Sequence, residues 1–453
     1  MEIFLIKALQ LILCFSLLVL LHEGGHFFFA KLFGVRVEKF CLFFDPWFSW
    51  KICKFKGTEY HIGWLPLGGY VKIAGMVDES MDTEQLKQPV QADEFRAKSA
   101  LQRLLIMVGG VLVNFLTALA LYAMILFVWG DTYTPVENMK HGFKFSTEAR
   151  KLGFRDGDIP LATDFGRVER FNGDFLRDLS KTKSVTVLRN GRETQLSMPG
   201  DLNLLDMLKH QPPFVAPLAP SDIDSVLAGG PAARAGVKAG DRLLAFDGET
   251  ISSWNEFNEI VARRADVLAT GTAADSARLR HTTLVVQHAG SERTDTLALH
   301  LTERYELGIF KHNPLADYEQ RTLHYSLLAS IPAGVAHGWD VLCGYVDDLK
   351  YLFTKDGASS VGSFGTIGNL FPATWDWLRF WELTAFISLM LAFMNILPIP
   401  ALDGGHILFL LVEVVTRRKP SEKFLEKAQM VGMYLLLALM ALAVFNDFRN
   451  LLF

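Results

Sequence analysis

Apolar residues gather in four long runs along the chain, and each run is close to or above the ~20 residues that a helix needs to cross a bilayer. The pattern predicts four transmembrane helices, at about residues 4–33, 101–129, 377–412 and 424–447. The first run stays apolar beyond His26, and no small-residue cleavage site follows its core. We therefore expect this segment to be retained rather than removed as a signal peptide.

Composition agrees with a membrane protein. Hydrophobic residues make up 50% of the 453 residues, and the chain contains 35 phenylalanines. The formal net charge of −4 offers no basic surface, which argues against a nucleic-acid partner. The four cysteines form no C-x-x-C pair, so a disulfide framework is not expected. These features predict a polytopic α-helical membrane protein whose partner is the lipid bilayer.

Lysine and arginine side chains predict which side of the membrane each connection faces. The short loop "TRRKPSEK" at 416–423 is basic, and so is the loop that follows the first apolar run. The basic residues of that loop include Lys31, Arg36, Lys39, Lys51, Lys54 and Lys56, with Arg96, Lys98 and Arg103 at the entry to the second run. We expect both loops in the cytoplasm, and the region 130–375 with both termini on the periplasmic or exterior side.

The first loop also contains a pattern typical of a β-hairpin. In "GTEYHIGWLPLGGYVKIAG", 57–75, the apolar residues Tyr60, Ile62 and Trp64 alternate with polar or small residues before a Pro-Leu-Gly-Gly turn. Beside a membrane span, such a hairpin is expected to re-enter the bilayer from the cytoplasmic side. An ordinary surface hairpin that binds a soluble partner is the alternative.

The middle region contains a duplication. Segments 148–168 and 231–251 share the frame A-R-x-x-G-x-x-x-G-D, with a one-residue slip at Arg234. Each resembles the PDZ domain, a β-rich module that accepts an extended peptide at a sheet edge. We expect a degenerate first copy at 131–212, whose strand Pro160 breaks, a second at 213–310, and an amphipathic linker at 311–375 on the outer membrane face. Simple spacers are the alternative.

The motif His-Glu-Gly-Gly-His lies inside the first apolar run. On a helix, His22 and His26 lie one turn apart on one face, so both imidazoles can reach one metal ion, and Glu23 can hold the attacking water. Imidazoles and a carboxylate in hydrocarbon cost several kcal/mol unless they are satisfied. A functional zinc site is therefore favoured over a pair of core histidines.

A catalytic zinc ion needs three protein ligands and an open fourth position. The best third ligand is Asp403 in "NILPIPALDGGHILFL", where Pro398 and Pro400 break the third apolar run and the helix restarts. Asp403 as a helix N-cap only, or His406 as the ligand in its place, are the alternatives. Both ligand segments are expected at the same depth, near the cytoplasmic side.

Together these motifs resemble the site-2 protease family over essentially the whole chain. The similarity rests on the HExxH motif, "PLGGYVK", "GGVLVNF" in the second run and N-x-x-P-x-x-x-L-D-G in the third. It implies an intramembrane zinc metalloprotease with Zn²⁺ on His22, His26 and Asp403, and Glu23 as catalytic acid and base. The implied substrates are single-span proteins already trimmed outside by another protease, such as anti-sigma factors, and remnant signal peptides.

The same resemblance carries a G-x-x-x-N motif onto Gly110 and Asn114, and a substrate-holding asparagine onto Asn395. We expect both Asn114 and Asn395 to contact the substrate. We expect the hairpin edge at Gly69, Tyr70 and Val71 to hold an unwound substrate as an added strand. The segment "CLFFDP" departs from the family pattern and concerns the substrate clamp rather than the metal ligands. A metal transporter and a non-catalytic PDZ-bearing chaperone or scaffold are the rival functions.

Overall fold

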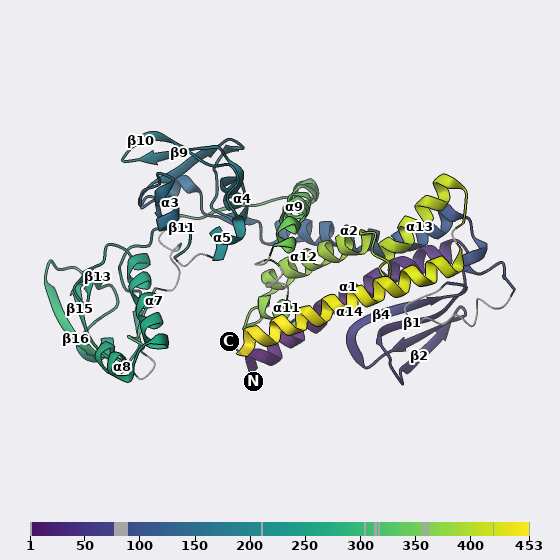
Figure 1. Ribbon diagram of the computed structural model, residues 1–453, viewed down its shortest axis with the longest axis horizontal. Coiled ribbons are helices and arrows are strands. Elements are labelled where there is room, and N and C mark those ends of the chain that lie inside the picture. The colour runs from purple at the N-terminus through teal and green to yellow at the C-terminus, as the bar shows by residue number, and fades with distance from the viewer. Residues whose placement is uncertain are drawn as a thin grey trace. The chain divides into compact units, whose positions relative to one another are not determined.

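The computed structural model describes residues 2–76, 89–209, 212–302, 305–311, 315, 318–354, 357, 362–419 and 421–452. The chain folds into two compact units (Figure 1). The first unit joins Met1–Asp131 to Leu323–Phe453, and the second is Thr132–Thr322. The second unit is thus inserted into the first.

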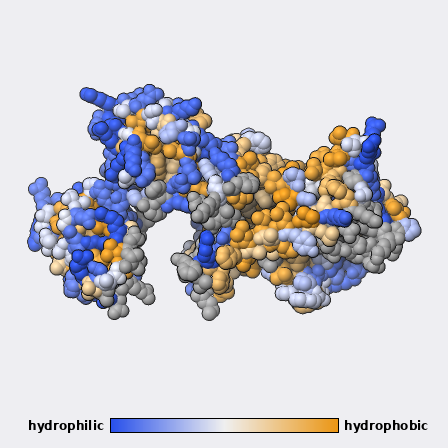
Figure 2. Space-filling model, viewed as in Figure 1, coloured by the Kyte–Doolittle hydropathy of each residue, from blue (hydrophilic) through white to orange (hydrophobic). Residues whose placement is uncertain are grey.

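The first unit contains the apolar helices. These are α1 (Glu2–Leu32), α2 (Ala100–Val128), α12 (Trp377–Ile396), α13 (Asp403–Thr416) and α14 (Glu422–Leu452). Four stretches in the described part of the chain are long and apolar enough to cross a membrane: Glu2–Leu32, Ala100–Val128, Trp377–Ile396 and Lys427–Arg449. Figure 2 shows hydrophobic residues over the surface of these helices. The four predicted runs are confirmed as helical, and the third is broken between α12 and α13 as its prolines predicted.

Helix α2 is the centre of this unit, because α1, α9 (Leu327–Asp348), α12 and α13 all contact it. A capping box of Ser99 and Gln102 begins it, after the short η2 (Phe95–Ala97). Its contact with α1 is backbone to backbone. A Cβ atom on Gly109 would lie 2.7 Å from the carbonyl oxygen of Gly25, and a Cβ atom on Gly25 would meet the carbonyl oxygen of Gly109. Only glycine fits at either position.

A four-stranded sheet lies beside α1. Its strands are β1 (Val37–Phe44), β2 (Trp50–Phe55), β3 (Thr58–Ile62) and β4 (Leu65–Ile73), in the order β2-β3-β1-β4. Strands β3 and β4 are those predicted within 57–75, but the prediction of a hairpin is wrong, because β1 lies between them. β1 pairs parallel to β3 and antiparallel to β4. β4 is an edge strand of this sheet, which explains why it tolerates Pro66.

The amphipathic helix expected in 311–375 is α9, followed by η4 (Leu349–Phe353) and α11 (Phe364–Leu370). Gly334 and Gly338 face α2, where a Cβ atom on Gly334 would lie 2.5 Å from the Cα of Ala123. Leu328 is 80% exposed and Trp339 is 57% exposed. Part of the predicted linker, 312–314, 316–317, 355–356 and 358–361, lies outside the described residues. Contact of α9 with the outer membrane surface stays a prediction.

The second unit contains two lobes with the same order and pairing of elements. The first has β7 (Ile159–Thr163), β8 (Gly166–Arg167), α4 (Gly173–Lys181), β9 (Ser184–Arg189) and β10 (Arg192–Ser197), with sheet order β10-β9-β7-β8. The second has β13 (Arg242–Phe246), β14 (Glu249–Thr250), α7 (Trp254–Thr270), α8 (Ala273–Leu279), β15 (His281–Gln287) and β16 (Thr294–His300), with order β14-β13-β15-β16. The matching topology agrees with the repeated sequence frame.

Shorter elements complete this unit: β5 (Asp131–Tyr133), η3 (Val136–Asn138), β6 (Phe143–Phe145), α3 (Thr147–Lys151), α5 (Leu204–Lys209), β11 (Val215–Pro217), β12 (Ser225–Val226), α6 (Pro231–Ala235), β17 (Ile309–Phe310) and β18 (Arg321–Leu323). Each lobe has its own hydrophobic core. Phe214 and Tyr318 pack in the core of the first lobe, beyond its predicted end at 212. Pro160 lies within β7 at a register shift against β9, so the prediction that it breaks this strand is wrong.

Alanine substitution of the two adjacent glycines of α1 is expected to change the free energy of unfolding differently. Gly25→Ala places a methyl group against the α2 backbone, and we expect the free energy of unfolding to fall by about 1–3 kcal/mol. Gly24 has no atom within 4 Å of an added Cβ, so Gly24→Ala is expected to be neutral or to gain up to about 1 kcal/mol of helix propensity. Thermal unfolding of the two variants in detergent tests this pair, and equal stability would contradict the close helix contact.

Candidate metal centre

Helix α1 presents two imidazoles on the face that contacts α2. His22 and His26 lie one turn apart, and their rings meet edge to face with centroids 4.9 Å apart. The Nε2 atoms of the two rings are 3.3 Å apart. His26 is buried, with 7% of its surface exposed, and His22 is partly buried. The spacing read from the sequence therefore brings both rings to one point.

Asp403 reaches the same point from the first turn of α13. The chain between α12 and α13 turns sharply, with Ala401 at a φ of 77°, and folds back onto the start of α13. A Cβ atom on Gly405 would lie 2.7 Å from the Cα of Pro400, so glycine is needed there. Arg103 of α2 pairs with Glu413 of α13 at 2.6 Å, which ties the two helices together. These contacts fix the position of Asp403 relative to α2.

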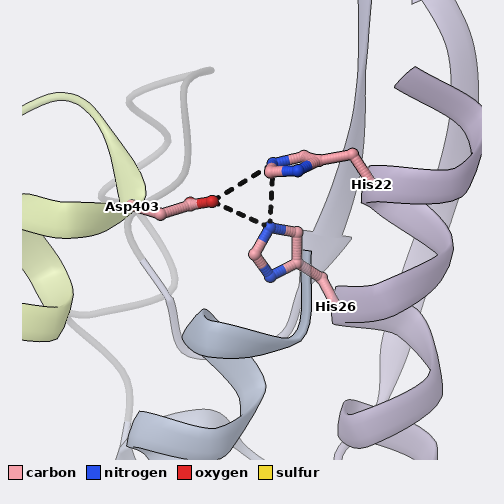
Figure 3. Close-up of side chains that lie close together, drawn as sticks. All are labelled: His22, His26 and Asp403. Atoms are coloured by element: carbon pink, nitrogen blue, oxygen red, sulfur yellow. Dashed lines mark hydrogen bonds and ion pairs between the residues drawn. The ribbon is translucent and has the colours of Figure 1, made fainter. Parts of the chain in front are cut away.

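The three side chains converge on each other, as Figure 3 shows. Oδ2 of Asp403 lies 3.1 Å from Nε2 of His22 and 3.3 Å from Nε2 of His26. Within the described residues, these three form the one group of His, Cys, Asp and Glu side chains whose ligand atoms all lie within 4.8 Å of one another. Asp403 is not the N-cap of α13, since Leu402 occupies that position and no side-chain cap bond forms. A role for Asp403 in capping alone is therefore excluded.

The donor set fits zinc in chemistry and in spacing. Two neutral imidazoles and a carboxylate are ordinary zinc ligands, and bonds of ~2.0–2.1 Å to a tetrahedral ion place ligand atoms about 3.3 Å apart. The observed separations of 3.1–3.3 Å agree with this value. Oδ2 of Asp403 is buried and receives no hydrogen bond of acceptable geometry. A cation between the three atoms would satisfy it.

Helix α2 provides the surface behind the imidazoles. Nδ1 of His26 lies 2.9 Å from the carbonyl oxygen of Ile106. At Gly110, a Cβ atom would lie 2.7 Å from Cε1 of His22 and would also collide with Nε2 of His26. Asn114 contacts Nδ1 of His22 through its side-chain amide at 3.3 Å. The sequence pattern G-x-x-x-N thus serves the histidines, a role that the carry-over of Asn114 as a substrate contact did not foresee.

A cavity of about 260 Å³ opens beside the three converging side chains. The predicted site residues that line it are His22, Glu23, His26, Gly69, Tyr70, Val71, Asn395 and Asp403. Asn114 is not among its lining residues, whereas His406 is. His406 is absent from the group of three converging side chains, in line with the preference for Asp403. The cavity therefore gathers residues that the sequence analysis proposed from α1, β4, α12 and α13.

One network at the cavity wall was not anticipated. Tyr70 of β4 donates its hydroxyl to Oδ1 of Asp45 at 2.9 Å, and Lys39 of β1 pairs with the same carboxylate. Although burial alone would raise it, hydrogen bonds from Lys39, Ser49 and Tyr70 hold the pKa of Asp45 below its usual value. Burial raises the pKa of Tyr70 to about 12, so this residue stays neutral. Asp45 belongs to the "CLFFDP" segment, whose departure from the family pattern was the available signal.

Comparisons with known proteins match the chain over nearly its whole length. The model of peptidase family M50 matches residues 10–439. The regulator of sigma-E protease RseP of Escherichia coli K12 is 28% identical over 99% of each chain. Protease RseP of Yersinia pestis is 29% identical over 97% of this chain and 98% of that protein. A protein of Vibrio cholerae named as a zinc metalloprotease is 28% identical over 97% and 98%.

The family match covers nearly the whole chain, including both segments that supply the converging side chains. The described helices and the inserted β-rich lobes fit a membrane protease of this kind. The chain therefore belongs to peptidase family M50, the site-2 protease family of zinc metalloproteases.

Proposed function

We propose that this chain hydrolyses a peptide bond inside the membrane segment of single-span proteins, with zinc held by His22, His26 and Asp403. The observation that carries the proposal is the convergence of these three ligand atoms, beside a cavity, among helices long enough to span a bilayer. Family membership supports the same activity and does not favour a non-catalytic PDZ-bearing scaffold.

A zinc ion held by His22, His26 and Asp403 would supply Lewis-acid polarisation of the scissile carbonyl and would lower the pKa of the attacking water toward ~7. The carboxylate of Glu23 takes a proton from that water and then delivers it to the leaving amine. Glu23 lines the same cavity as the three converging side chains, one residue from His22, so its carboxylate is placed beside the proposed site of the reaction. The cavity admits the water that the reaction consumes.

The substrate must expose its backbone before it can be cut, because a helix hides its amides in internal hydrogen bonds. We propose that the unwound segment pairs with the free edge of β4 at Gly69, Tyr70 and Val71. These residues line the cavity, and β4 has a strand neighbour on one side only among the described residues. Asn395, also in the cavity wall, takes an exposed backbone group.

We further propose the cellular setting. The chain lies in the bacterial cytoplasmic membrane, with the metal centre toward the cytoplasm and the lobes, as PDZ-like domains at 131–212 and 213–310, outside. Its substrates are first trimmed outside by another protease, and anti-sigma factors and remnant signal peptides are the expected classes. The lobes act either as receptors for a new C-terminus or as a filter against large outer domains. The basic loops and the repeated lobe topology support this arrangement.

Substitution of Glu23 tests the activity directly. In Glu23→Gln we expect cleavage of a tagged single-span reporter to fall at least about 1,000-fold while bound zinc is unchanged, because the general base is lost and the ligands remain. Reporter fragments in membranes and metal content of the purified protein measure the two effects. Persistent cleavage by this variant would contradict the protease function.

Substitution of Asp403 and of His406, which lie in the same turn of α13, tests which residue is the third zinc ligand. We expect Asp403→Ala to lose zinc, because one of three protein ligands is removed, and His406→Ala to retain it. Metal content after dialysis against a weak chelator distinguishes them. Loss of zinc from the His406 variant alone would transfer the ligand role to that residue.

Proline scanning tests the edge of β4. Adjacent residues of an edge strand direct their N–H groups alternately to the neighbouring strand and to the free side. Of Tyr70→Pro and Val71→Pro, one therefore removes a bond to β1 and lowers thermal stability. We expect the other to lower cleavage while stability and zinc content stay the same. Unaltered cleavage in both variants would rule out strand addition at this edge.

Removal of the inserted lobes tests where the activity resides. All residues of the proposed site lie in the first unit, so excision of 134–320, with a short turn joining β5 to β18, is expected to preserve cleavage of a substrate that has a short outer tail. A parallel assay with an untrimmed substrate decides between filter and receptor, since a filter predicts gain and a receptor predicts loss. Complete inactivity of a folded, zinc-loaded deletion protein would contradict this separation.

A further inference from the structure

Three positions of α2 at four-residue steps face the histidine pair. Ile106 offers its carbonyl oxygen to Nδ1 of His26 at 2.9 Å, and Gly110 makes room for both rings. Asn114 places its amide 3.3 Å from Nδ1 of His22. Residues four apart lie on one face of a helix, so these contacts come from a single stripe of α2. Ile106 accepts a hydrogen bond from His26, and Gly110 leaves space for both rings. The function of the contact between Asn114 and His22 depends on which nitrogen of His22 binds the metal.

In each imidazole, the nitrogen that binds the metal determines the protonation of the other nitrogen. Both Nε2 atoms face Oδ2 of Asp403, so a metal ion at this point takes the Nε2 lone pairs. A neutral imidazole that gives Nε2 to a metal carries its proton on Nδ1, and that N–H needs an acceptor. For His26 the acceptor is the carbonyl oxygen of Ile106. For His22, Asn114 is the one polar side chain described in contact with Nδ1.

The amide of Asn114 contains an acceptor without a partner. Asn114 is 1% exposed, and its Oδ1 atom is buried with no hydrogen bond, while Nδ2 is the atom that faces His22. The oxygen and nitrogen of an amide are assigned from the hydrogen bonds around them. A half-turn of the amide brings Oδ1 to Nδ1 of His22, where it accepts the proton that metal binding through Nε2 requires. The same rotation satisfies the buried oxygen.

We propose that Asn114 is a positioning residue that accepts a hydrogen bond from Nδ1–H of His22 and thereby holds this ring in the tautomer and orientation that bind zinc. The hydroxyl of Ser388 in α12 donates to the backbone carbonyl of Asn114 at 2.8 Å, and this bond leaves the side-chain amide free to face His22. The inference rests on the proposed zinc role of His22. It replaces the expectation that Asn114 contacts substrate.

Two substitutions separate the acceptor from the shape of the side chain. Asn114→Leu keeps the volume and removes the acceptor, and we expect zinc affinity of the full-length protein to fall roughly 10–100-fold. Asn114→Asp keeps an acceptor oxygen, and its zinc affinity is expected to equal or exceed that of the unaltered protein. Competition with a chromogenic chelator gives the affinities, and thermal unfolding of the metal-free proteins gives stability.

Controls distinguish positioning from packing. Ser388→Ala removes a buried hydrogen bond next to Asn114 without touching an imidazole, so its zinc affinity should be unchanged. The Co²⁺-loaded Leu variant should show altered visible absorption, and the Asp variant should not. If Asn114→Leu does not fold, Asn114→Ala replaces it, because alanine removes the acceptor without adding volume. Unchanged zinc affinity without the acceptor, or equal loss in the Asp and Leu variants, overturns the proposal.

The readouts also separate this inference from the proposed function. Zinc affinity is measured without substrate and can be repeated in the Glu23→Gln background. If Glu23→Gln continues to cleave, the protease function fails while the affinity results stand on their own. If Asn114→Leu raises KM for a substrate and leaves zinc affinity unchanged, the positioning role fails and the protease function remains.

Discussion

The cost of placing two imidazoles and a carboxylate among apolar helices governs the rest of this structure. Each polar group in hydrocarbon is unfavourable by several kcal/mol unless another group satisfies it. His22, His26 and Asp403 meet this constraint by converging to separations of 3.1–3.3 Å. That convergence requires α1, α2 and α13 to approach closely, and Gly25, Gly109 and Gly110 are present where the approach is tightest. The glycines therefore allow the close helix packing that brings the three ligand side chains together.

A second constraint is that hydrolysis needs water and an extended backbone in a region where both are disfavoured. Irregular backbone at membrane depth is tolerated where it lines a polar cavity. The turn between α12 and α13 and the edge strand β4 both contribute to the cavity wall, the turn with Ala401 and Leu402 and the strand with Tyr70. These unfavourable elements thus meet around one cavity. The proposed strand addition would place substrate backbone in the same location.

The sequence was most informative where a local spacing decides a contact. The four-residue step between His22 and His26 and the helix restart at Asp403 could both be read from adjacent residues. Pairing across the sheet could not, because β1 enters between β3 and β4 from an earlier stretch whose alternation is weak. Pro160 was misjudged because a register shift, invisible in sequence, accommodates it within β7. The contact of Asn114 with His22 depends on how two helices pack, which no spacing within either helix reveals.

The two ends of the inserted unit lie together, since β5 pairs with β18 and the hydroxyls of Thr132 and Thr322 are 2.9 Å apart. The chain therefore leaves the first unit and re-enters it at adjacent positions. The loop-closure entropy that the first unit pays is then that of a short connection, whatever the length of the insertion. Lobes could therefore be gained, lost or exchanged during evolution with little effect on the stability of the metal centre. This would allow the inserted lobes to diversify while the chemistry of the first unit stays fixed.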